Sequence, residues 1–256
     1  MAGQGVVSIA ALSTQGLDKR FGSLVVASDI NLVIPHGVRY ALIGPNGAGK
    51  TTLINLITGM LRPDAGKILL GDADITAFKP DARVKRGLVR TFQINALFPH
   101  LNALEAVTLA VCERRGVAGE WWKPLRAHAD AVEEAYGILA SLMLAADCYR
   151  LTRELAYGQQ RLLEIALALA TRPKVLLLDE PAAGVPREES AELFAAIAGL
   201  SQDITVLFIE HDMDLVFRFA SRIIVMVGGR ILVEGTPQEI AGDARVREVY
   251  LGGDAP

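Results

Sequence analysis

Short apolar runs alternate with amphipathic segments along much of the chain. Residues 40–44 (YALIG), 175–180 (VLLLDE) and 204–212 (ITVLFIEHD) each hold an apolar run of the length typical of a buried strand. Residues 51–60 (TTLINLITGM) follow the first run with apolar residues at helical spacing. Strands that alternate with helices predict a parallel sheet covered by helices.

Other regions depart from this alternation. Residues 16–44 offer several short strands broken by Gly, Pro and Asp, and residues 66–75 (GKILLGDADI) predict a short strand and turn. Residues 222–235 (RIIVMVGGRILVEG) predict a hairpin-like pair of strands. Between about 95 and 170, stretches rich in Ala, Leu and Glu predict helices, and residues 116–124 (GVAGEWWKP) predict a loop.

Composition narrows the class of protein. The 256 residues, 51% of them hydrophobic, suffice for one large domain or for one domain with an insertion. The net charge of -3 gives no basic field for nucleic acid, and no apolar run approaches the roughly 20 residues of a membrane helix. The start lacks Lys or Arg before its apolar stretch, which makes a poor signal peptide, and the scattered Cys112 and Cys148 suit a reducing cytosol.

A glycine-rich loop between a strand and a helix carries the clearest chemistry. Residues 44–51 (GPNGAGKT) fit the pattern G-x-x-x-x-G-K-[ST]. Gly47 and Gly49 can adopt turns that a Cβ forbids, so that backbone N–H groups point inward and form an anion nest. The following helix adds its free N–H groups. Lys50 is expected to contact the β- and γ-phosphates of a nucleotide, and Thr51 to bind Mg²⁺ through its hydroxyl.

Two acids end the second apolar run. Asp179 and Glu180 follow four aliphatic residues at the carboxyl end of a strand, where ligands bind in open α/β sheets. Asp179 can hold Mg²⁺ through water, and Glu180 can polarise the water that attacks the γ-phosphate. Taken alone, such carboxylates could equally cap the next turn.

The motifs together resemble the ATP-binding subunits of ABC transporters. Residues 44–52 resemble the family's Walker A motif and residues 175–180 its Walker B motif, RTFQ holds a Q-loop, LAYGQQR resembles the LSGGQ signature, and IEHD holds a switch histidine. The resemblance covers nearly the whole chain. It implies an α/β P-loop NTPase fold of ABC type, with a mixed central sheet flanked by helices, an antiparallel β subdomain and an inserted helical subdomain.

The resemblance also implies domain boundaries and site residues. Residues 1–256 form a single ATPase domain, with a RecA-like core plus β subdomain at about 8–94 and 171–256 and the helical subdomain at about 95–170. The catalytic residues implied are Glu180, His211 and Gln93, and the metal-binding residues are Thr51, Gln93 and Asp179. The residues implied to bind ATP are Phe21, Gly44, Pro45, Asn46, Gly47, Ala48, Gly49, Lys50, Thr51, Thr52, Asp179, Ala156, Tyr157, Gly158 and Gln159.

Narrower features are similar to one branch of the family. The stretch RTFQINALFPHLNALEAV and the ending VREVYLG resemble ATP-binding subunits of branched-chain amino acid importers. That branch implies ATP and Mg²⁺ as cofactors and a complex of two ATPase subunits, two membrane permease subunits and an extracytoplasmic solute-binding protein, with this chain peripheral at the cytoplasmic face of the inner membrane. A urea importer, a lipopolysaccharide-type exporter and a soluble ABC ATPase acting on nucleic acid remain alternatives.

Two positions depart from the family pattern. Ala156 replaces the signature serine, which removes a hydroxyl worth roughly 1.5–3 kcal/mol as a charge-assisted donor to the partner's γ-phosphate. Tyr157 stands for the first signature glycine, and Pro186 stands where Asn or Asp is usual, without an N–H and with a fixed φ. The neighbouring Trp121 and Trp122 suit either a partly packed loop or a contact with a partner.

Overall fold

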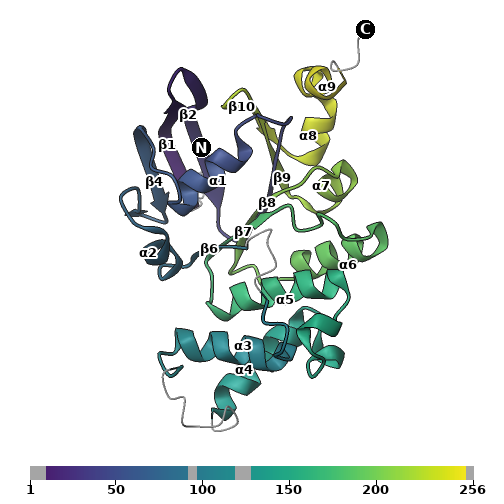
Figure 1. The fold of residues 1–256 in the computed structure, drawn as a ribbon. Coiled ribbons are helices and arrows are strands. Elements are labelled where there is room, and N and C mark those ends of the chain that lie inside the picture. The colour runs from purple at the N-terminus through teal and green to yellow at the C-terminus, as the bar shows by residue number, and fades with distance from the viewer. Residues whose placement is uncertain (1–9, 92–96, 119–127, 252–256) are drawn as a thin grey trace, which may run out of the picture.

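The computed structural model describes residues 10–91, 97–118 and 128–251. Its larger sheet has six strands in the order β10-β9-β3-β8-β7-β6 (Figure 1). Strands β9, β3, β8, β7 and β6 run parallel, and β10 pairs antiparallel with β9. The strands are β3 (Arg39–Ile43), β6 (Leu88–Arg90), β7 (Val175–Asp179), β8 (Thr205–Ile209), β9 (Arg222–Val227) and β10 (Arg230–Gly235). The predicted parallel sheet and hairpin are confirmed.

A second, antiparallel sheet comes from the N-terminal part, in the order β2-β1-β4-β5. Its strands are β1 (Ala10–Phe21), β2 (Leu24–Pro35), β4 (Ala65–Leu70) and β5 (Ala73–Asp74). The prediction of several short strands is wrong here, because β1 and β2 are 12 residues each. Gly16 (φ 53) and Asp29 (φ 51) lie where the register of the two strands shifts, so these residues bulge the strands and do not end them.

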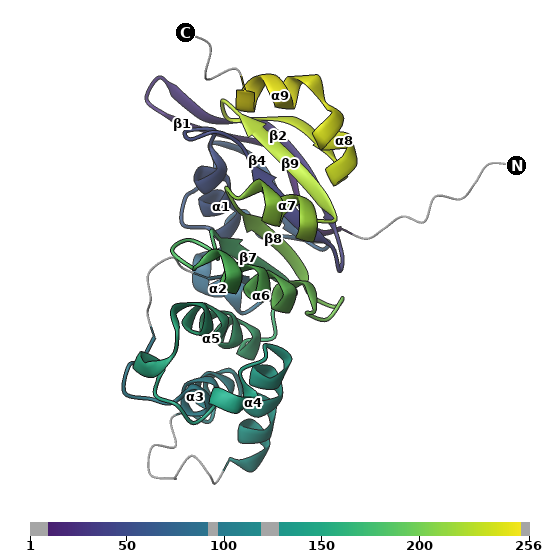
Figure 2. The same ribbon diagram turned by 90° about the vertical axis from the view of Figure 1, so that its right-hand side faces the viewer.

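Helices cover the sheets and extend beyond them. Figures 1 and 2 show α3 and α4 at one end of the molecule, and α8 and α9 at the other end together with the β1–β2 hairpin. The helices are α1 (Lys50–Thr58), α2 (Pro80–Val84), α3 (Ala103–Arg114), α4 (Ala129–Ser141), α5 (Tyr157–Ala170), α6 (Arg187–Ala198), α7 (Met213–Phe219), α8 (Pro237–Gly242) and α9 (Ala244–Leu251). Short 3-10 helices span Ala145–Asp147 and Thr152–Glu154.

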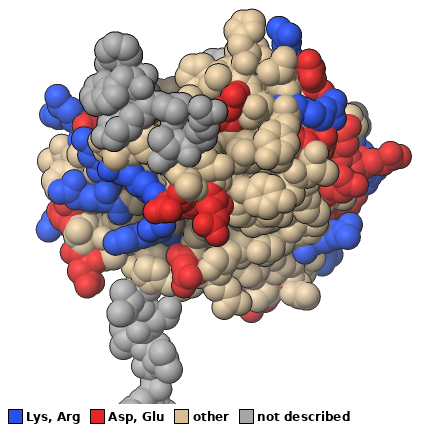
Figure 3. Space-filling view, turned by 90° about the horizontal axis from the view of Figure 1, so that it is seen from below, with Lys and Arg blue, Asp and Glu red and all other residues tan. Residues whose placement is uncertain are grey.

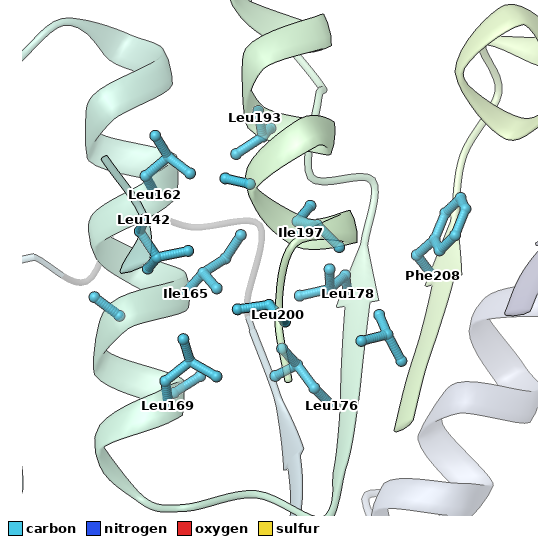
Figure 4. Packing of buried hydrophobic residues seen from close by; sticks show 14 of the residues in the cluster. Leu142, Leu162, Ile165, Leu169, Leu176, Leu178, Leu193, Ile197, Leu200 and Phe208 are labelled. Carbon is cyan, nitrogen blue, oxygen red and sulfur yellow. The ribbon is translucent and has the colours of Figure 1, made fainter. Parts of the chain in front are cut away.

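The six-stranded sheet separates two hydrophobic cores. Successive side chains of a strand point to opposite faces, so Tyr40 and Leu42 pack with α1 and the antiparallel sheet, while Ala41 and Ile43 pack on the other side. Figure 4 shows the second core, where α5 and α6 turn their leucines and isoleucines toward β7. A strand buried on both faces has no polar alternation, which is why the apolar runs in the sequence are continuous.

Candidate functional site

The glycine loop joins β3 to α1 and needs its glycines for close approach. A Cβ on Gly44 (φ 153) would lie 2.2 Å from the Met226 carbonyl oxygen, and one on Gly49 (φ 100) would lie 2.5 Å from that of Val26. Strands β9 and β2 therefore press on the loop from outside. The Ala48 carbonyl also accepts a hydrogen bond from the Gly229 N–H at 2.9 Å, which ties the loop to the turn between β9 and β10.

Lys50 is a buried cation at the first position of α1. Its Nζ donates to the carbonyl oxygens of Gly44 (2.6 Å) and Pro45 (3.1 Å), and the residue is 7% exposed. Burial lowers the pKa of Lys50, and the negative charges of Glu180 and Asp179 oppose that shift. The ammonium group thus lies against the loop with two carboxylates near it, a position from which it can bind phosphate oxygens.

The remaining residues of the loop and of the first turn of α1 differ in their exposure to solvent. Asn46 and Gly47 are exposed, Pro45 and Thr52 are half-buried, and Ala48 packs into the core. Thr51, in the first turn of α1, is exposed. The Thr51 hydroxyl and the Asp179 carboxylate are oxygen ligands of the kind that Mg²⁺ prefers. Mg²⁺ usually keeps several waters and takes few protein ligands. Within the described ranges no group of three His, Cys, Asp or Glu residues forms a metal-binding cluster.

Asp179 ends β7 and is paired with an arginine that the sequence analysis did not single out. The Arg90 guanidinium, at the end of β6, donates through Nη2 to Asp179 Oδ2 and through Nη1 to Asn55 Oδ1 at 2.7 Å. Asn55 lies one turn after Thr51, on the same face of α1. Arg90 therefore links α1 to β7. In the sequence it precedes Gln93 by three positions.

Glu180 and His211 meet at the carboxyl ends of β7 and β8. His211 Nε2 lies 2.9 Å from Glu180 Oε1. Glu180 has a left-handed backbone (φ 49), held by a hydrogen bond from its N–H to the Ile209 carbonyl at 3.0 Å. A pocket of about 390 Å³ opens beside the pair and is lined in part by Ala182 and Glu210. A carboxylate in contact with an imidazole in an open pocket can accept a proton from water.

The signature residues begin α5, on a different part of the fold. Helix α5 packs mainly on α3, α4 and α6, whereas α1 packs on β2 and β6. The Gly158 N–H donates to Glu189 Oε2 at 3.1 Å, and the Tyr157 hydroxyl accepts from Arg161 Nη2 at 2.8 Å. Ala156 is the N-cap residue of α5, and its side chain makes no capping hydrogen bond. The Ala156 backbone N–H donates to Gln159 Oε1 at 3.0 Å. Glu189 of α6 thus binds an N–H group of this helix start.

Of the other residues singled out from the sequence, the structure describes some and does not describe others. Phe21 is half-exposed at the tip of the β1–β2 hairpin, with the Lys19 ammonium 5.6 Å from its ring centroid. Pro186 is the N-cap of α6. Gln93, Trp121 and Trp122 lie outside the described residues.

Three residues near the site escaped the sequence analysis besides Arg90. Glu210, between the end of β8 and His211, is 5% exposed and binds backbone N–H groups of two loops. Glu189 lies in a segment to which no motif assigns chemistry. Tyr250 of α9 has its pKa raised by burial to about 12, and a Gly44 N–H that donates to its oxygen opposes the shift. Glu210 and Tyr250 each lie in a quoted stretch, as the second letter of IEHD and the fifth letter of VREVYLG, but neither motif assigns them a role.

No helix in the described ranges is long and apolar enough to cross a membrane.

The sequence matches known proteins over most of its length. Residues 27–183 match the ABC transporter family, and residues 230–256 match the family described as branched-chain amino acid ATP-binding cassette transporter. The chain is 40% identical to the high-affinity branched-chain amino acid transport ATP-binding protein BraF of Pseudomonas aeruginosa, over 94% of this chain and 97% of that protein. It is 39% identical to LivG of Escherichia coli K12, a protein of the same description, over the same shares.

A solved structure agrees with these sequence relatives. The crystal structure of the ADP conformation of MJ1267, an ATP-binding cassette of an ABC transporter, superimposes with a TM-score of 0.82 at 33% identity, covering 95% of this chain and 99% of that one. A nucleotide-free ATP-binding cassette superimposes with a TM-score of 0.79 at 32% identity, covering 94% and 98%. The fold is therefore that of an ABC-type P-loop NTPase, and the chain belongs to the ABC transporter family as one of its ATP-binding cassettes, which are ATPases.

Proposed function

We propose that this chain binds and hydrolyses MgATP to energise an importer of branched-chain or other hydrophobic amino acids. One observation carries the proposal: the buried Lys50 ammonium, the Asp179 carboxylate and the Glu180–His211 pair gather at the carboxyl ends of β3, β7 and β8. The relatives BraF and LivG are described as branched-chain amino acid transport proteins, and the match at 230–256 is to a family of the same transport class.

Each residue has a role in this proposal. Lys50 and the loop N–H groups bind the β- and γ-phosphates, and Phe21 stacks on the adenine. Thr51, Asp179 and Gln93 hold Mg²⁺, which neutralises charge on the phosphate oxygens. Glu180 accepts the proton of the attacking water, and His211, in contact with Glu180 Oε1, orients that carboxylate and faces the γ-phosphate.

The signature residues act on the nucleotide of a partner. In this proposal two ATPase subunits close over two nucleotides, and the start of α5, with Ala156, Tyr157, Gly158 and Gln159, contacts the γ-phosphate held by the other subunit. A nucleotide that bridges two chains stabilises their closed pair by mass action. Hydrolysis removes the bridging phosphate, so the pair opens.

The membrane partners contact the helical end of the molecule. We take residues of about 95–170 as a helical subdomain, and about 8–94 with 171–256 as the core and β subdomain. The face seen from below in Figure 3 mixes charges of both signs with a broad uncharged area, and Phe98, Leu109 and Tyr149 are exposed hydrophobics of this part of the chain. Two permease subunits would cover this face at the cytoplasmic side of the membrane, with a solute-binding protein outside.

Two substitutions test the ATPase. We expect Lys50→Ala to abolish ATP binding in calorimetry, because it removes the ammonium group that lies against the loop carbonyls of Gly44 and Pro45. We expect Glu180→Gln to bind ATP without turnover and to elute as a dimer in gel filtration with ATP at micromolar protein. Wild-type protein with ADP is the control, and a monomeric Glu180→Gln protein in ATP contradicts the proposed closure.

Uptake tests the transported solute. Cells that lack this subunit should lose uptake of labelled leucine and regain it with the wild-type chain but not with Lys50→Ala. Urea uptake that depends on the chain instead points to a urea importer, and an outer-membrane lipopolysaccharide defect points to an exporter. Co-purification with ribosomes or RNA, in place of permease subunits, contradicts the transport function.

A further inference from the structure

Glu210 is a buried carboxylate that the reaction scheme above does not use. It directly follows β8, a strand buried along its whole length, and is itself 5% exposed. A buried carboxylate is costly unless its oxygens are hydrogen-bonded. Both oxygens are: Oε1 accepts from the Ala182 N–H at 2.9 Å, and Oε2 accepts from the His211 N–H at 3.1 Å.

These two N–H groups belong to different loops. Ala182 lies in the loop between β7 and α6, two residues after Glu180, and His211 lies in the loop between β8 and α7. The side chains of Glu180 and His211 meet across the same gap at 2.9 Å. Glu210 therefore joins, through backbone groups, the two loops whose side chains form the hydrolytic pair.

The electrostatic environment fits a structural carboxylate. Burial raises the pKa of Glu210, the N–H groups of Ala182, His211 and Asp212 oppose the shift, and the negative charge of Glu180 adds to it. The backbone N–H groups of these three loop residues thus stabilise the negative charge of the buried Glu210 carboxylate. Losing one acceptor would leave a part-buried N–H group without its partner, which is unfavourable.

We propose that Glu210 is a positioning residue for ATP hydrolysis: by binding the backbones of both loops, it sets His211 relative to Glu180. The inference rests on the proposed function. Glu210 does not touch nucleotide in this scheme; it acts through His211 and through the loop after Glu180. The glycine loop joins β3 to α1 and Lys50 begins α1, whereas Glu210 binds the loops after β7 and β8, so these hydrogen bonds do not involve the phosphate-binding loop.

Glu210→Gln is the direct test, because it keeps the shape but replaces one acceptor oxygen by an NH₂ group that faces a backbone N–H. We expect kcat for ATP to fall about 10- to 100-fold, the size that a misplacement of about 1 Å can produce. The Kd for ATP should stay within about twofold of wild type. Glu239→Gln is the matched control: Glu239 Oε2 also accepts a backbone N–H, from Thr236 at 2.7 Å, but in α8, and this variant should match wild type in both quantities.

A double-mutant cycle separates positioning from general destabilisation. In single-turnover measurements on a His211→Ala background, Glu210→Gln should cost much less than it does in the wild type, because the residue it positions is gone. If Glu210→Gln does not fold, Glu210→Asp, which is one methylene too short to reach both loops, serves in the same comparison.

The outcomes are distinct. A wild-type kcat in the variant, an equal loss in both backgrounds, or a parallel loss of ATP affinity overturns the positioning role. A wild-type protein that binds no ATP overturns the proposed function itself, whatever the variant does.

Discussion

At the residue scale, Gly49 and Gly158, two glycines of the segments proposed to bind nucleotide, differ in what a Cβ would meet. On Gly49 it would face the Val26 backbone carbonyl at 2.5 Å, at φ 100, whereas on Gly158 it would face the Glu189 carboxylate oxygen at 2.6 Å. A carboxylate at the end of a flexible side chain can move, and a backbone carbonyl in a sheet cannot. We expect Gly49→Ala to destabilise by about 1–3 kcal/mol and Gly158→Ala by less than about 1 kcal/mol in urea unfolding. Equal losses would contradict this account.

Arg90 shows the cost of a buried charge. It is the partner of Asp179, whose side chain is 5% exposed. We expect Arg90→Met to lower the free energy of unfolding by about 3–5 kcal/mol, because it leaves the carboxylate buried without its counter-charge. Adding Asp179→Asn should restore part of the loss, which urea titrations of the single and double variants would measure. A double variant no more stable than Arg90→Met would show that the pair does not carry the effect.

Motif spacing predicted the residues that we propose act on phosphate, because a phosphate-binding loop needs particular residue types at fixed positions. The supporting residues were not predictable in this way. Arg90, Glu189 and Glu210 come from separate elements, and each contacts the site through a fold-dependent approach of two segments. A single sequence shows that such residues are charged, but it does not show which segment they face.

At the element scale, Glu134 joins α4 to its neighbours. It accepts from Arg114 of α3 at 2.8 Å, from Arg115 at 2.6 Å and from Arg172 beyond α5 at 3.0 Å. These arginines, Arg114 first, lower the pKa of Glu134 to about 2. A pKa lowered in the folded state means that the network stabilises the fold above the ordinary pKa of 4.5 and that this contribution disappears as the pH falls to about 2.

Glu134→Gln tests this pH dependence. At pH 7 we expect the variant to be less stable by about 3 kcal/mol, which is the free energy linked to a pKa lowered from 4.5 to about 2. Between pH 4.5 and pH 2 the wild type should lose stability more steeply than the variant, so that the two unfolding curves converge. Urea unfolding at several pH values measures the difference, and a difference that is constant with pH contradicts the ionic origin.

Elements with a strong apolar pattern were predictable, and short or bulged ones were not. Strands β7 and β8 have 5 residues each and consist mostly of a continuous apolar run, and the segment that became α1 has apolar residues at helical spacing. Strand β6 has only 3 residues, too few for any pattern, and it exists because it pairs with β7. The breaks expected near Gly16 became bulges because the partner strands continue past them.

At the scale of the whole molecule, the six-stranded sheet lies between the two cores and contributes side chains to both. The proposed nucleotide site lies at the carboxyl ends of its parallel strands. Core residues on both faces belong to the same strands, so loss of the sheet exposes both cores. The chain should therefore unfold as one cooperative unit, with the same midpoint for backbone circular dichroism and for hydrogen exchange in β7 and α1.

MgATP should stabilise this unit as a whole. A ligand that binds only the folded chain adds about 2.7 kcal/mol at a hundred times its Kd, which for a protein of this size is a rise in Tm of about 5–10 °C. Because one sheet carries both cores, the rise should be equal for probes on either face, and Lys50→Ala should abolish it at both. If MgATP protected only the face that holds α1 and left α5 unchanged, the two cores would be thermodynamically separate, and signals could not pass from the phosphate loop to the helical end through the sheet.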